Sequence, residues 1–396
     1  MNNKLLNFKY ALVNVFYFML GCGALGYANN FLKFHGYPSS LIGIVLSLIS
    51  VLALVGQTFM APVIDRSTKI NEKKFILITL LIGMISYLVM LMMHGENWFL
   101  LLICVVGFSF TSMGLPFLNS LAFAYEQEGG RINYGVSRGI GSAAYAVAGP
   151  VIGMMMTAAG GGDEKITEVL PVFLLITGAL TMATVFWMKD PKKVVKEDEK
   201  TKSISYPAFF RKYHQITLVL AALVLIYFCH MLVNTYMINV LENIGGNTAD
   251  QGNAIFIQAM CELPPMFLFA LILKKVDVDK LMAFGALAYI VKHALLCFAP
   301  NMAVFYIAMV LQMFSYAVIM PASVYFADKH VEAEDRNKGQ IAMTAASTVG
   351  SLLANLVGGF LLDFTSVSAV LTFGFIATVI GAVLMVIGIR NLSKKA

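Results

Sequence analysis

The stretch FILITLLIGMISYLVMLMM, residues 75–93, runs for nineteen residues without a charged side chain. At a rise of about 1.5 Å per residue, a helix of this length spans the roughly 30 Å hydrocarbon layer of a bilayer. The rest of the chain has the same character, because 59% of its 396 residues are hydrophobic and only 13% are charged. A soluble protein carries about 25% charged residues. The sequence therefore predicts a membrane protein that crosses the bilayer repeatedly.

Apolar runs of this kind occur twelve times, which predicts an all-α membrane protein with twelve transmembrane helices. The first run begins within ten residues of the N-terminus. It is too long for the core of a signal peptide and no small-residue cleavage site follows it, so we expect it to be retained. The predicted spans are residues 8–34, 40–64, 75–93, 98–125, 132–157, 171–188, 215–240, 254–273, 281–299, 302–326, 341–362 and 369–389.

Positive charge gives the expected orientation, because Lys and Arg concentrate in cytoplasmic loops. With both termini cytoplasmic, 24 of the 28 Lys and Arg residues lie on the cytoplasmic side. Lys33 and Lys165 fall on the external side, and Arg138 and Lys292 lie within spans. This bias accounts for the net charge of +6, so we expect membrane lipid as a partner and no nucleic acid.

The five cysteines all fall within predicted spans and lack the spacing of metal ligands. Buried free cysteine generally behaves as a small apolar residue. No nucleophile–base pair, phosphate-binding loop or soluble catalytic domain is evident in the sequence. We therefore expect no metal, no other cofactor and no enzymatic activity. The cysteines are Cys22, Cys104, Cys229, Cys261 and Cys297.

The longest polar stretch, residues 189–215, has mixed charge and no apolar period, as in a solvated linker. It divides the twelve spans six and six. We expect an N-terminal six-helix bundle at 1–188, a cytoplasmic linker at 189–213 and a C-terminal six-helix bundle at 214–396.

Two pairs of similar segments connect these halves. GSAAYAVAGPVIG at residue 141 is echoed by GSLLANLVGGFLL at 350, and DRSTKINEKK at 65 by KKVDVDKL at 274. Both pairs have an offset of 209 residues. Two echoes at one offset indicate parallel repeats of six spans, an architecture found in many secondary transporters.

One carboxylate lies deep within a span. Of the 22 acidic residues only Glu262 does so, in the stretch FIQAMCELPPMFLFALIL at 256–273. A charge at the bilayer centre costs about 2.5–3.5 kcal/mol or more, so such a residue is a functional candidate. Pro264 and Pro265 cannot donate to the carbonyls four residues earlier, and free carbonyls in a membrane must face protein or a water-filled cavity. We therefore expect a hydrated polar cavity beside span eight.

Basic side chains share the depth of this carboxylate. Glu262 and Lys292 lie fifteen residues on either side of Asp277, at the turn between two spans, and so fall near one plane. His293 is adjacent to Lys292, and His230 in span seven lies at a similar depth. We predict a proton-coupling cluster of Glu262, Lys292, His293 and His230. The alternative is a structural ion pair between Glu262 and Lys292, and the two roles do not exclude each other.

The N-terminal half offers a second polar set. Arg138 lies about two turns into span five, and Tyr145 follows seven residues later on the same helical face. A guanidinium with aromatic rings and amides suits a hydroxyl-rich ligand. The alternative is that the amides and tyrosines satisfy contacts between helices. The predicted solute-binding residues are Arg138, Tyr145, Asn119, Asn234, Tyr236, Asn30 and Glu262.

Several segments are similar to a known family. Residues 16–66, beginning FYFMLGCGALGYANN, resemble the first two helices of the oligosaccharide:proton symporters, which include lactose permease. NYGVSRGIGSAAYAVAG at 133–149 resembles their fifth helix, where an arginine and an aromatic residue contact sugar; Arg138 and Tyr145 match these positions. CELPPMFLFALILKKVDVDKLMAFG resembles helices eight and nine of related nucleoside and sugar symporters, in which a buried acid and base recur. The resemblance implies the major facilitator superfamily.

The resemblance also has departures. APVIDRSTKINEKK is similar to a degenerate form of the superfamily's cytoplasmic loop motif, which implies that Asp65 and Arg66 tune the balance between inward and outward states. Gln312 and Ser315 stand where lactose permease has a histidine and an acid, and Tyr145 replaces its tryptophan. The helix-four acid of lactose permease maps to a residue without a carboxylate. The galactoside site is therefore incomplete, and the resemblance does not imply lactose as the solute.

These observations together predict a proton-coupled symporter of a small hydroxylated solute, such as a sugar, oligosaccharide or nucleoside, that works by alternating access. Its partners would be the solute, the proton and membrane lipid, and we expect a monomer in the cell membrane. One alternative is a proton-driven exporter of apolar or cationic compounds, since 24 methionines and 29 phenylalanines can line a permissive pocket. A more remote alternative is a membrane-embedded sensor or enzyme.

Overall fold

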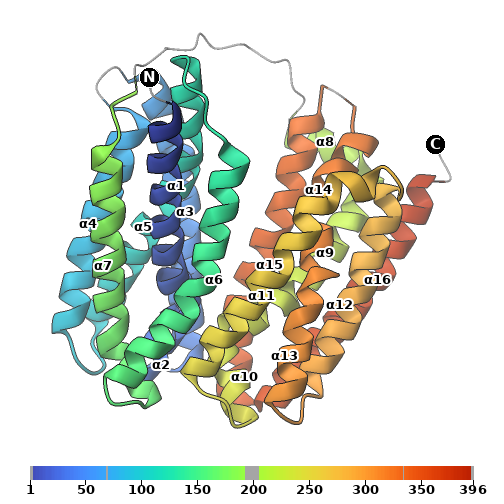
Figure 1. Ribbon diagram of the computed structural model, residues 1–396. Coiled ribbons are helices and arrows are strands. Elements are labelled where there is room, and N and C mark those ends of the chain that lie inside the picture. Colours follow the sequence, from blue (N-terminus) through green and yellow to red (C-terminus); the bar gives the residue numbers. More distant parts are fainter. Residues whose placement is uncertain (1–2, 68–69, 192–204, 333, 394–396) are drawn as a thin grey trace. The chain divides into compact units, whose positions relative to one another are not determined.

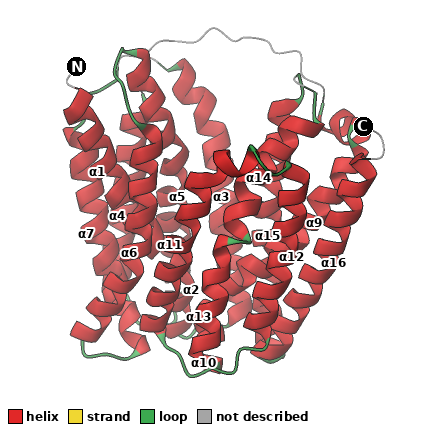
Figure 2. Cartoon of the chain, turned by 45° about the vertical axis from the view of Figure 1, so that its right-hand side comes forward, coloured by secondary structure: helices red, strands yellow, loops and turns green. Residues whose placement is uncertain are grey.

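The computed structural model describes residues 3–67, 70–191, 205–332 and 334–393. Every regular element in these residues is helical (Figure 1, Figure 2), and twelve helical segments among them are long and apolar enough to cross a membrane. The predicted fold class is therefore confirmed. The twelve segments are Asn3–Gly26, Ser39–Ile64, Glu72–Met92, Trp98–Gln127, Tyr134–Ala158, Asp163–Trp187, His214–Thr235, Thr248–Leu273, Val278–Cys297, Met302–His330, Lys338–Phe364 and Val367–Leu392.

The helices are named in chain order, with short 3₁₀ and π segments labelled η. They are α1 (Asn3–Gly21), η1 (Cys22–Gly26), α2 (Ala28–Phe34), α3 (Ser39–Arg66), α4 (Glu72–Met92), α5 (Trp98–Gln127), α6 (Tyr134–Ala158), η2 (Asp163–Lys165), α7 (Ile166–Trp187), α8 (Tyr206–Lys212), α9 (His214–Thr235), α10 (Met237–Asn243), α11 (Thr248–Leu273), α12 (Val278–Cys297), α13 (Met302–Val310), η3 (Leu311–Met313), α14 (Tyr316–His330), α15 (Arg336–Phe364) and α16 (Val367–Ser393).

Contacts between residues divide the chain into two compact units. Unit 1 comprises Met1–Asp198 and Thr248–Phe256, and unit 2 comprises Glu199–Asn247 and Ile257–Ala396. Helix α11 therefore contributes its first nine residues to unit 1 and the rest to unit 2.

The two units have the same internal packing. In unit 1, α1 packs against α6 and α7, and α4 packs against α5 and α7. In unit 2, α9 packs against α15 and α16, and α12 packs against α14 and α16. In both sets the first span contacts the fifth and sixth, and the third contacts the fourth and sixth. This is the pattern that parallel repeats of six spans would give.

The first and seventh spans are not continuous helices, contrary to the prediction of unbroken runs at 8–34 and 215–240. In span one, α1 passes into the π-helical segment η1 and breaks at Tyr27 before α2. The local sequence LGCGALG is rich in glycine, which favours helix poorly. Gly23 packs closely there, since an added Cβ would lie 3.0 Å from side-chain atoms of Phe173 and Leu174. Span seven breaks at Tyr236, between α9 and α10.

Span ten is interrupted as well, where residues 302–326 were expected to form one helix. The 3₁₀ turn η3 separates α13 from α14, and both the N–H and the Oγ of Ser315 bond to the carbonyl of Leu311. The stretch LQMFSY contains neither glycine nor proline, so the local sequence does not predict this break. By contrast, α11 runs through Pro264 and Pro265 without ending.

Three side chains bond to the carbonyls at the end of α7. Lys9 Nζ donates to Trp187 O at 2.9 Å, Lys73 Nζ donates to Met188 O at 2.5 Å, and the Tyr125 hydroxyl donates to Lys189 O. The last carbonyls of a helix lack intrahelical partners and carry the negative end of the helix dipole, so lysine suits this position. Lys73 also forms an ion pair with Asp190 at 3.0 Å. The start of the segment after α7 is thereby fixed to unit 1.

A similar anchor holds the start of unit 2. Lys212 Nζ lies 3.1 Å from Asp335 Oδ2 and 2.7 Å from Glu332 Oε2, and the Tyr213 hydroxyl donates to Asp335 at 3.1 Å. Burial tends to raise the pKa of Asp335, but the hydrogen bonds from Lys212 and Tyr213 and the nearby positive charge outweigh it. The pKa of this carboxyl therefore lies below its ordinary value.

Lys73→Met should destabilise the protein, because the carbonyl of Met188 and the carboxylate of Asp190 lose their donor. A hydrogen bond to a charged group contributes about 1.5–3 kcal/mol, and a lower midpoint of thermal unfolding in detergent would measure its loss. Lys74→Met is the matched control, since Lys74 is exposed one residue away. Equal midpoints for both variants would contradict the role assigned to Lys73.

Asp335→Asn should lower thermal stability near neutral pH and lose this effect in acid. Because the folded-state pKa of Asp335 is depressed, its contribution is present above the ordinary pKa of about 4 and disappears as pH falls through the lower folded value. Unfolding midpoints of wild type and variant, measured from neutral to acid pH, should therefore converge. Glu334→Gln, at an exposed neighbouring residue, serves as control. A difference that stays constant with pH speaks against this ion pair.

Candidate functional site

In unit 1, Arg138 stacks on an aromatic ring. Its Cζ lies 4.3 Å from the centroid of Phe18 on α1, a distance at which a cation is attracted to the ring face. Gly141, one turn further along α6, permits this arrangement. A Cβ added there would lie 2.9 Å from Phe18 Cδ2 and 3.3 Å from Asn14 Cβ. The glycine thus lets α1 approach α6 closely enough for Phe18 to lie against Arg138.

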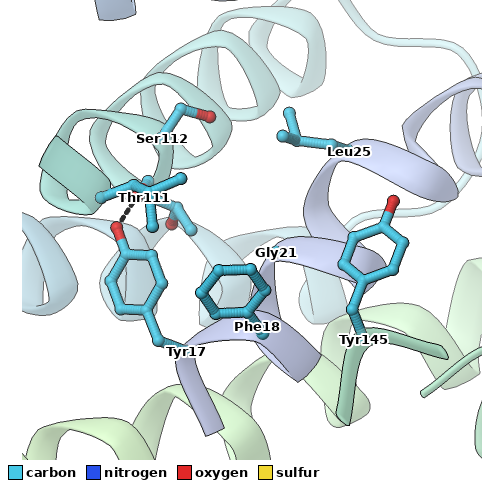
Figure 3. A pocket seen from close by; sticks show the side chains of 8 residues that line it. Tyr17, Phe18, Gly21, Leu25, Thr111, Ser112 and Tyr145 are labelled. Carbon is cyan, nitrogen blue, oxygen red and sulfur yellow. Dashed lines mark hydrogen bonds between the residues drawn. The ribbon is translucent and has the colours of Figure 1, made fainter. Parts of the chain in front are cut away.

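Phe18 also lines a cavity of about 130 Å³ between α1, η1, α5 and α6. Figure 3 shows the rings of Tyr17 and Tyr145 on either side of Phe18. A cavity of roughly 150 Å³ accommodates benzene, so this one has about the size of a single six-membered ring. The lining residues are Tyr17, Phe18, Gly21, Leu25, Thr111, Ser112, Leu115 and Tyr145.

Two of the lining side chains carry hydroxyl groups that already donate hydrogen bonds to backbone carbonyls. The Tyr17 hydroxyl donates to Thr111 O, which fixes its ring. Ser112 Oγ donates to Phe108 O at 2.9 Å, so its proton is engaged within its own helix, and the surface that faces the cavity is apolar. Elsewhere in unit 1, Asn14 and Asn119 each have a buried side-chain oxygen that accepts no hydrogen bond from the described residues. These oxygens are acceptors for hydroxyl groups or water.

Asn30 lies in another part of unit 1. Its Nδ2 donates to Gln251 Oε1 at 2.9 Å and lies 3.4 Å from Thr248 Oγ1, both on the first turns of α11. Gln251 in turn donates to Gly26 O at 2.8 Å, at the end of η1. Neither Asn30 nor Arg138 lines the cavity of Phe18 and Tyr145, and Arg138 adjoins it only through the Phe18 ring.

In unit 2, Glu262 and Lys292 meet at a glutamine. Gln312 Nε2 donates to Glu262 Oε1 at 2.7 Å, and Lys292 Nζ donates to Gln312 Oε1. Lys292 is 1% exposed and Gln312 is fully buried. Among the residues that the structure describes, no ion pair within 4.0 Å includes Glu262. The acid and the base are therefore joined through a neutral amide.

The two predicted histidines border this chain. His293 Nδ1 lies 2.7 Å from Thr378 Oγ1, which donates its own proton to Gly374 O at 3.1 Å. With that proton on Gly374 O, Thr378 Oγ1 accepts from Nδ1–H, and Nε2 is buried with no partner among the described residues. Tyr289 lies between the histidines, with ring centroids 5.1 Å from His293 and 5.5 Å from His230.

The remaining predicted residues of unit 2 are hydrogen-bonded within α9 or to α15. Asn234 Nδ2 lies 3.1 Å from His230 Nε2. The hydroxyl of Tyr236 is buried and donates to Asn355 O on α15 at 2.7 Å, while Thr235 Oγ1 donates to Asn355 Oδ1. Tyr236 therefore ties the break after α9 to α15.

The conformational motif can be placed only in part. The backbone of Asp65 and Arg66 forms the end of α3, and their side chains lie outside what the structure describes.

Three residues that the sequence did not single out as site residues belong to these clusters. Phe18 lies under Arg138, Gln312 joins Glu262 to Lys292, and Thr378 orients His293. The sequence did point to Gln312, because it occupies a position where lactose permease has a titratable residue. Phe18 and Thr378 had none, since aromatic and hydroxyl side chains are common in such spans.

A family model described as MFS_1 like family matches residues 7–375, which is most of the chain. The chain belongs to this family. It is therefore a transporter of the major facilitator superfamily and a multi-pass membrane protein that handles a small-molecule solute, as the resemblance implied.

Individual relatives agree with this assignment. The maltose permease of Geobacillus stearothermophilus is 24% identical over 354 residues, covering 87% of this chain and 85% of the permease. A crystal structure of the nucleoside transporter NupG matches with a TM-score of 0.77 at 16% identity, covering 100% of this chain and 100% of that one. A bacterial homolog of the human lysosomal transporter Spinster matches with a TM-score of 0.68 at 14% identity, covering 98% and 96%. At such identities the structures show the shared fold.

Gly141→Ala should destabilise this transporter. The new Cβ would force Phe18 away from Arg138 or spread α1 from α6, and overpacking of this kind costs about 1–3 kcal/mol. A lower midpoint of thermal unfolding would record it. Gly135→Ala on the same helix meets nothing within 4 Å, so it should leave the midpoint unchanged or raise it. If the two variants behave alike, the close approach at Gly141 is unimportant.

Proposed function

We propose that this transporter carries a small hydroxylated solute, a sugar, oligosaccharide or nucleoside, together with a proton by alternating access. Solute binding would rest on unit 1 and proton binding on unit 2. Both termini would be cytoplasmic, and the working form would be a monomer surrounded by membrane lipid.

The cavity in unit 1 supports the choice of solute. A ring-sized space bordered by Phe18, Tyr17 and Tyr145 suits a sugar or ribose ring, whose C–H faces stack on aromatic rings. Arg138 does not line this cavity but stacks on Phe18, so in this state it would act on the solute by holding that ring in place. The relatives named above point the same way, because maltose and nucleosides are both rich in hydroxyl groups.

The observation that carries the proton proposal is the bonding of Glu262. A carboxylate locked in a direct ion pair resists protonation, whereas Glu262 receives a neutral amide from Gln312. A charge is costly within a membrane span, whereas the ammonium of Lys292 beyond the amide compensates a negative charge at Glu262. These opposing influences suit a group that gains and loses a proton during a cycle.

The same geometry favours a proton over a metal cation as the coupling ion. A hard cation such as sodium needs several oxygen ligands around it. At Glu262 the nearest polar neighbour presents an N–H group, and the oxygen of that amide is occupied by an ammonium. A second positive charge here would meet Lys292 without gaining ligands.

In the proposed cycle, Glu262 takes a proton from outside and the solute binds at the aromatic cavity. Movement of the halves then exposes both to the cytoplasm, where Glu262 releases its proton. His230 and His293 would border the proton path, with His293 Nε2 as an acceptor. Asp65 and Arg66 would influence the balance between the two states.

Glu262→Gln should abolish accumulation driven by a pH gradient while leaving solute exchange intact, because an amide at this position cannot carry the proton. Maltose and uridine serve as probes, first in a thermal-shift screen that also includes a lipophilic cation, then in proteoliposomes. Glu242→Gln, at an exposed residue of the same unit, is the control.

Full accumulation by Glu262→Gln would remove this residue from the mechanism. Expulsion of the lipophilic cation in exchange for protons, with no uptake of either hydroxylated probe, would establish an exporter in place of the symporter.

A further inference from the structure

We propose that Gln312 is a positioning residue that couples Glu262 to Lys292 through its two hydrogen bonds. Binding of a proton at Glu262 then changes the environment of Lys292. This inference rests on the proposed function, because it assigns how the proton site is connected to its base. It concerns a residue at which this chain departs from the permease it resembles.

The chemistry of the two neighbours allows only one orientation of the amide. An ammonium group has donors and no acceptor, and an ionised carboxylate has acceptors and no donor. The oxygen of Gln312 must therefore face Lys292 and its nitrogen must face Glu262, which is the arrangement observed. A reversed amide would place N–H against N–H at one end and oxygen against oxygen at the other.

The fold holds this amide in place. Gln312 is the middle residue of η3, the turn that interrupts span ten, and its side chain is fully buried. Glu262 comes from α11 and Lys292 from α12, so the amide connects three spans of unit 2. Glutamine has the length required, whereas asparagine is one methylene shorter and cannot reach both partners from the same backbone.

Protonation of Glu262 would weaken the hydrogen bonds that connect Glu262, Gln312 and Lys292. A hydrogen bond to an ionised acceptor is roughly twice as strong as a neutral one, and this advantage disappears when the carboxylate is neutralised. The buried ammonium of Lys292 then loses the negative charge that balances it through the amide, and an unbalanced buried charge is strongly destabilising. Lys292 would gain by moving toward water or another acceptor, which links proton binding to rearrangement of α12 and η3.

Other titratable groups lie around Glu262, Gln312 and Lys292 and must be considered in any experiment that changes pH. They are Cys229 and His230 on α9, Cys261 on α11, and Tyr289 and His293 on α12. The experiment therefore needs a signal that belongs to Glu262 alone.

Infrared difference spectra of the full-length protein in liposomes, without solute, provide this signal. The bands of Glu262 are those absent from Glu262→Gln: the carboxylate stretch in alkali and the carbonyl stretch in acid. Gln312→Met keeps the length of the side chain but removes the amide, so it should shift both bands. Gln312→Asn should shift them likewise, because its amide is too short. Gln258→Met is the matched control, at a glutamine one turn before Glu262 on α11.

A double-mutant cycle then tests whether the effect of Lys292 on Glu262 passes through the amide of Gln312. Lys292→Met should shift the Glu262 bands in the wild-type background and have little further effect in the Gln312→Met background; Lys292→Gln replaces it if expression fails. The proposal is overturned if Lys292→Met shifts the Glu262 bands as much in the Gln312→Met background as in the wild type. It is also overturned if Gln312→Asn leaves the Glu262 bands at their wild-type positions. If no carbonyl band of Glu262 forms in acid, the proton site itself fails, whereas the carboxylate band in alkali still decides the role of Gln312.

Discussion

Polar groups inside a bilayer must find their partners within the protein, because hydrocarbon offers none. This constraint accounts for most of what distinguishes one span of this transporter from another. Spans one and ten break where a side chain bonds to a backbone carbonyl: Gln251 donates to Gly26 O, and Ser315 Oγ donates to Leu311 O. The few charged side chains at depth are engaged in the same way, Arg138 by an aromatic ring and Lys292 by an amide.

The two units place different chemistry in the same framework. In both, the first span packs on the fifth and sixth, yet unit 1 holds a cavity bordered by aromatic rings and unit 2 holds the acid, the base and two histidines. A repeat supplies two equivalent scaffolds, and divergence of a small number of side chains gives each its own task. Under the proposed function, solute and proton would then act on separate halves, and coupling would arise because both halves take part in one movement.

Much of this could be read from the sequence because the membrane imposes long-range regularity. The lengths of the apolar runs determine the twelve spans, and equal distances from a turn placed Glu262 and Lys292 at one depth, where Gln312 joins them. The breaks at Tyr27, Tyr236 and Leu311–Met313 were missed. The glycines of LGCGALG weaken the helix before Tyr27 without defining where it ends, and no glycine or proline marks the breaks at Tyr236 and Leu311–Met313. Asn30 and Tyr236 were assigned to the solute on residue type alone, whereas the structure engages them with Gln251 and Asn355.

The grip of Lys9, Lys73 and Tyr125 on the end of α7 acts on main-chain oxygens, which every amino acid possesses. Side chains at Met188 and Lys189 can therefore vary during evolution without loosening the junction, while the three residues that hold it cannot. Substitutions should therefore accumulate at Met188 and Lys189 and spare Lys9, Lys73 and Tyr125, so the segment that follows α7 can change its composition and keep its point of attachment.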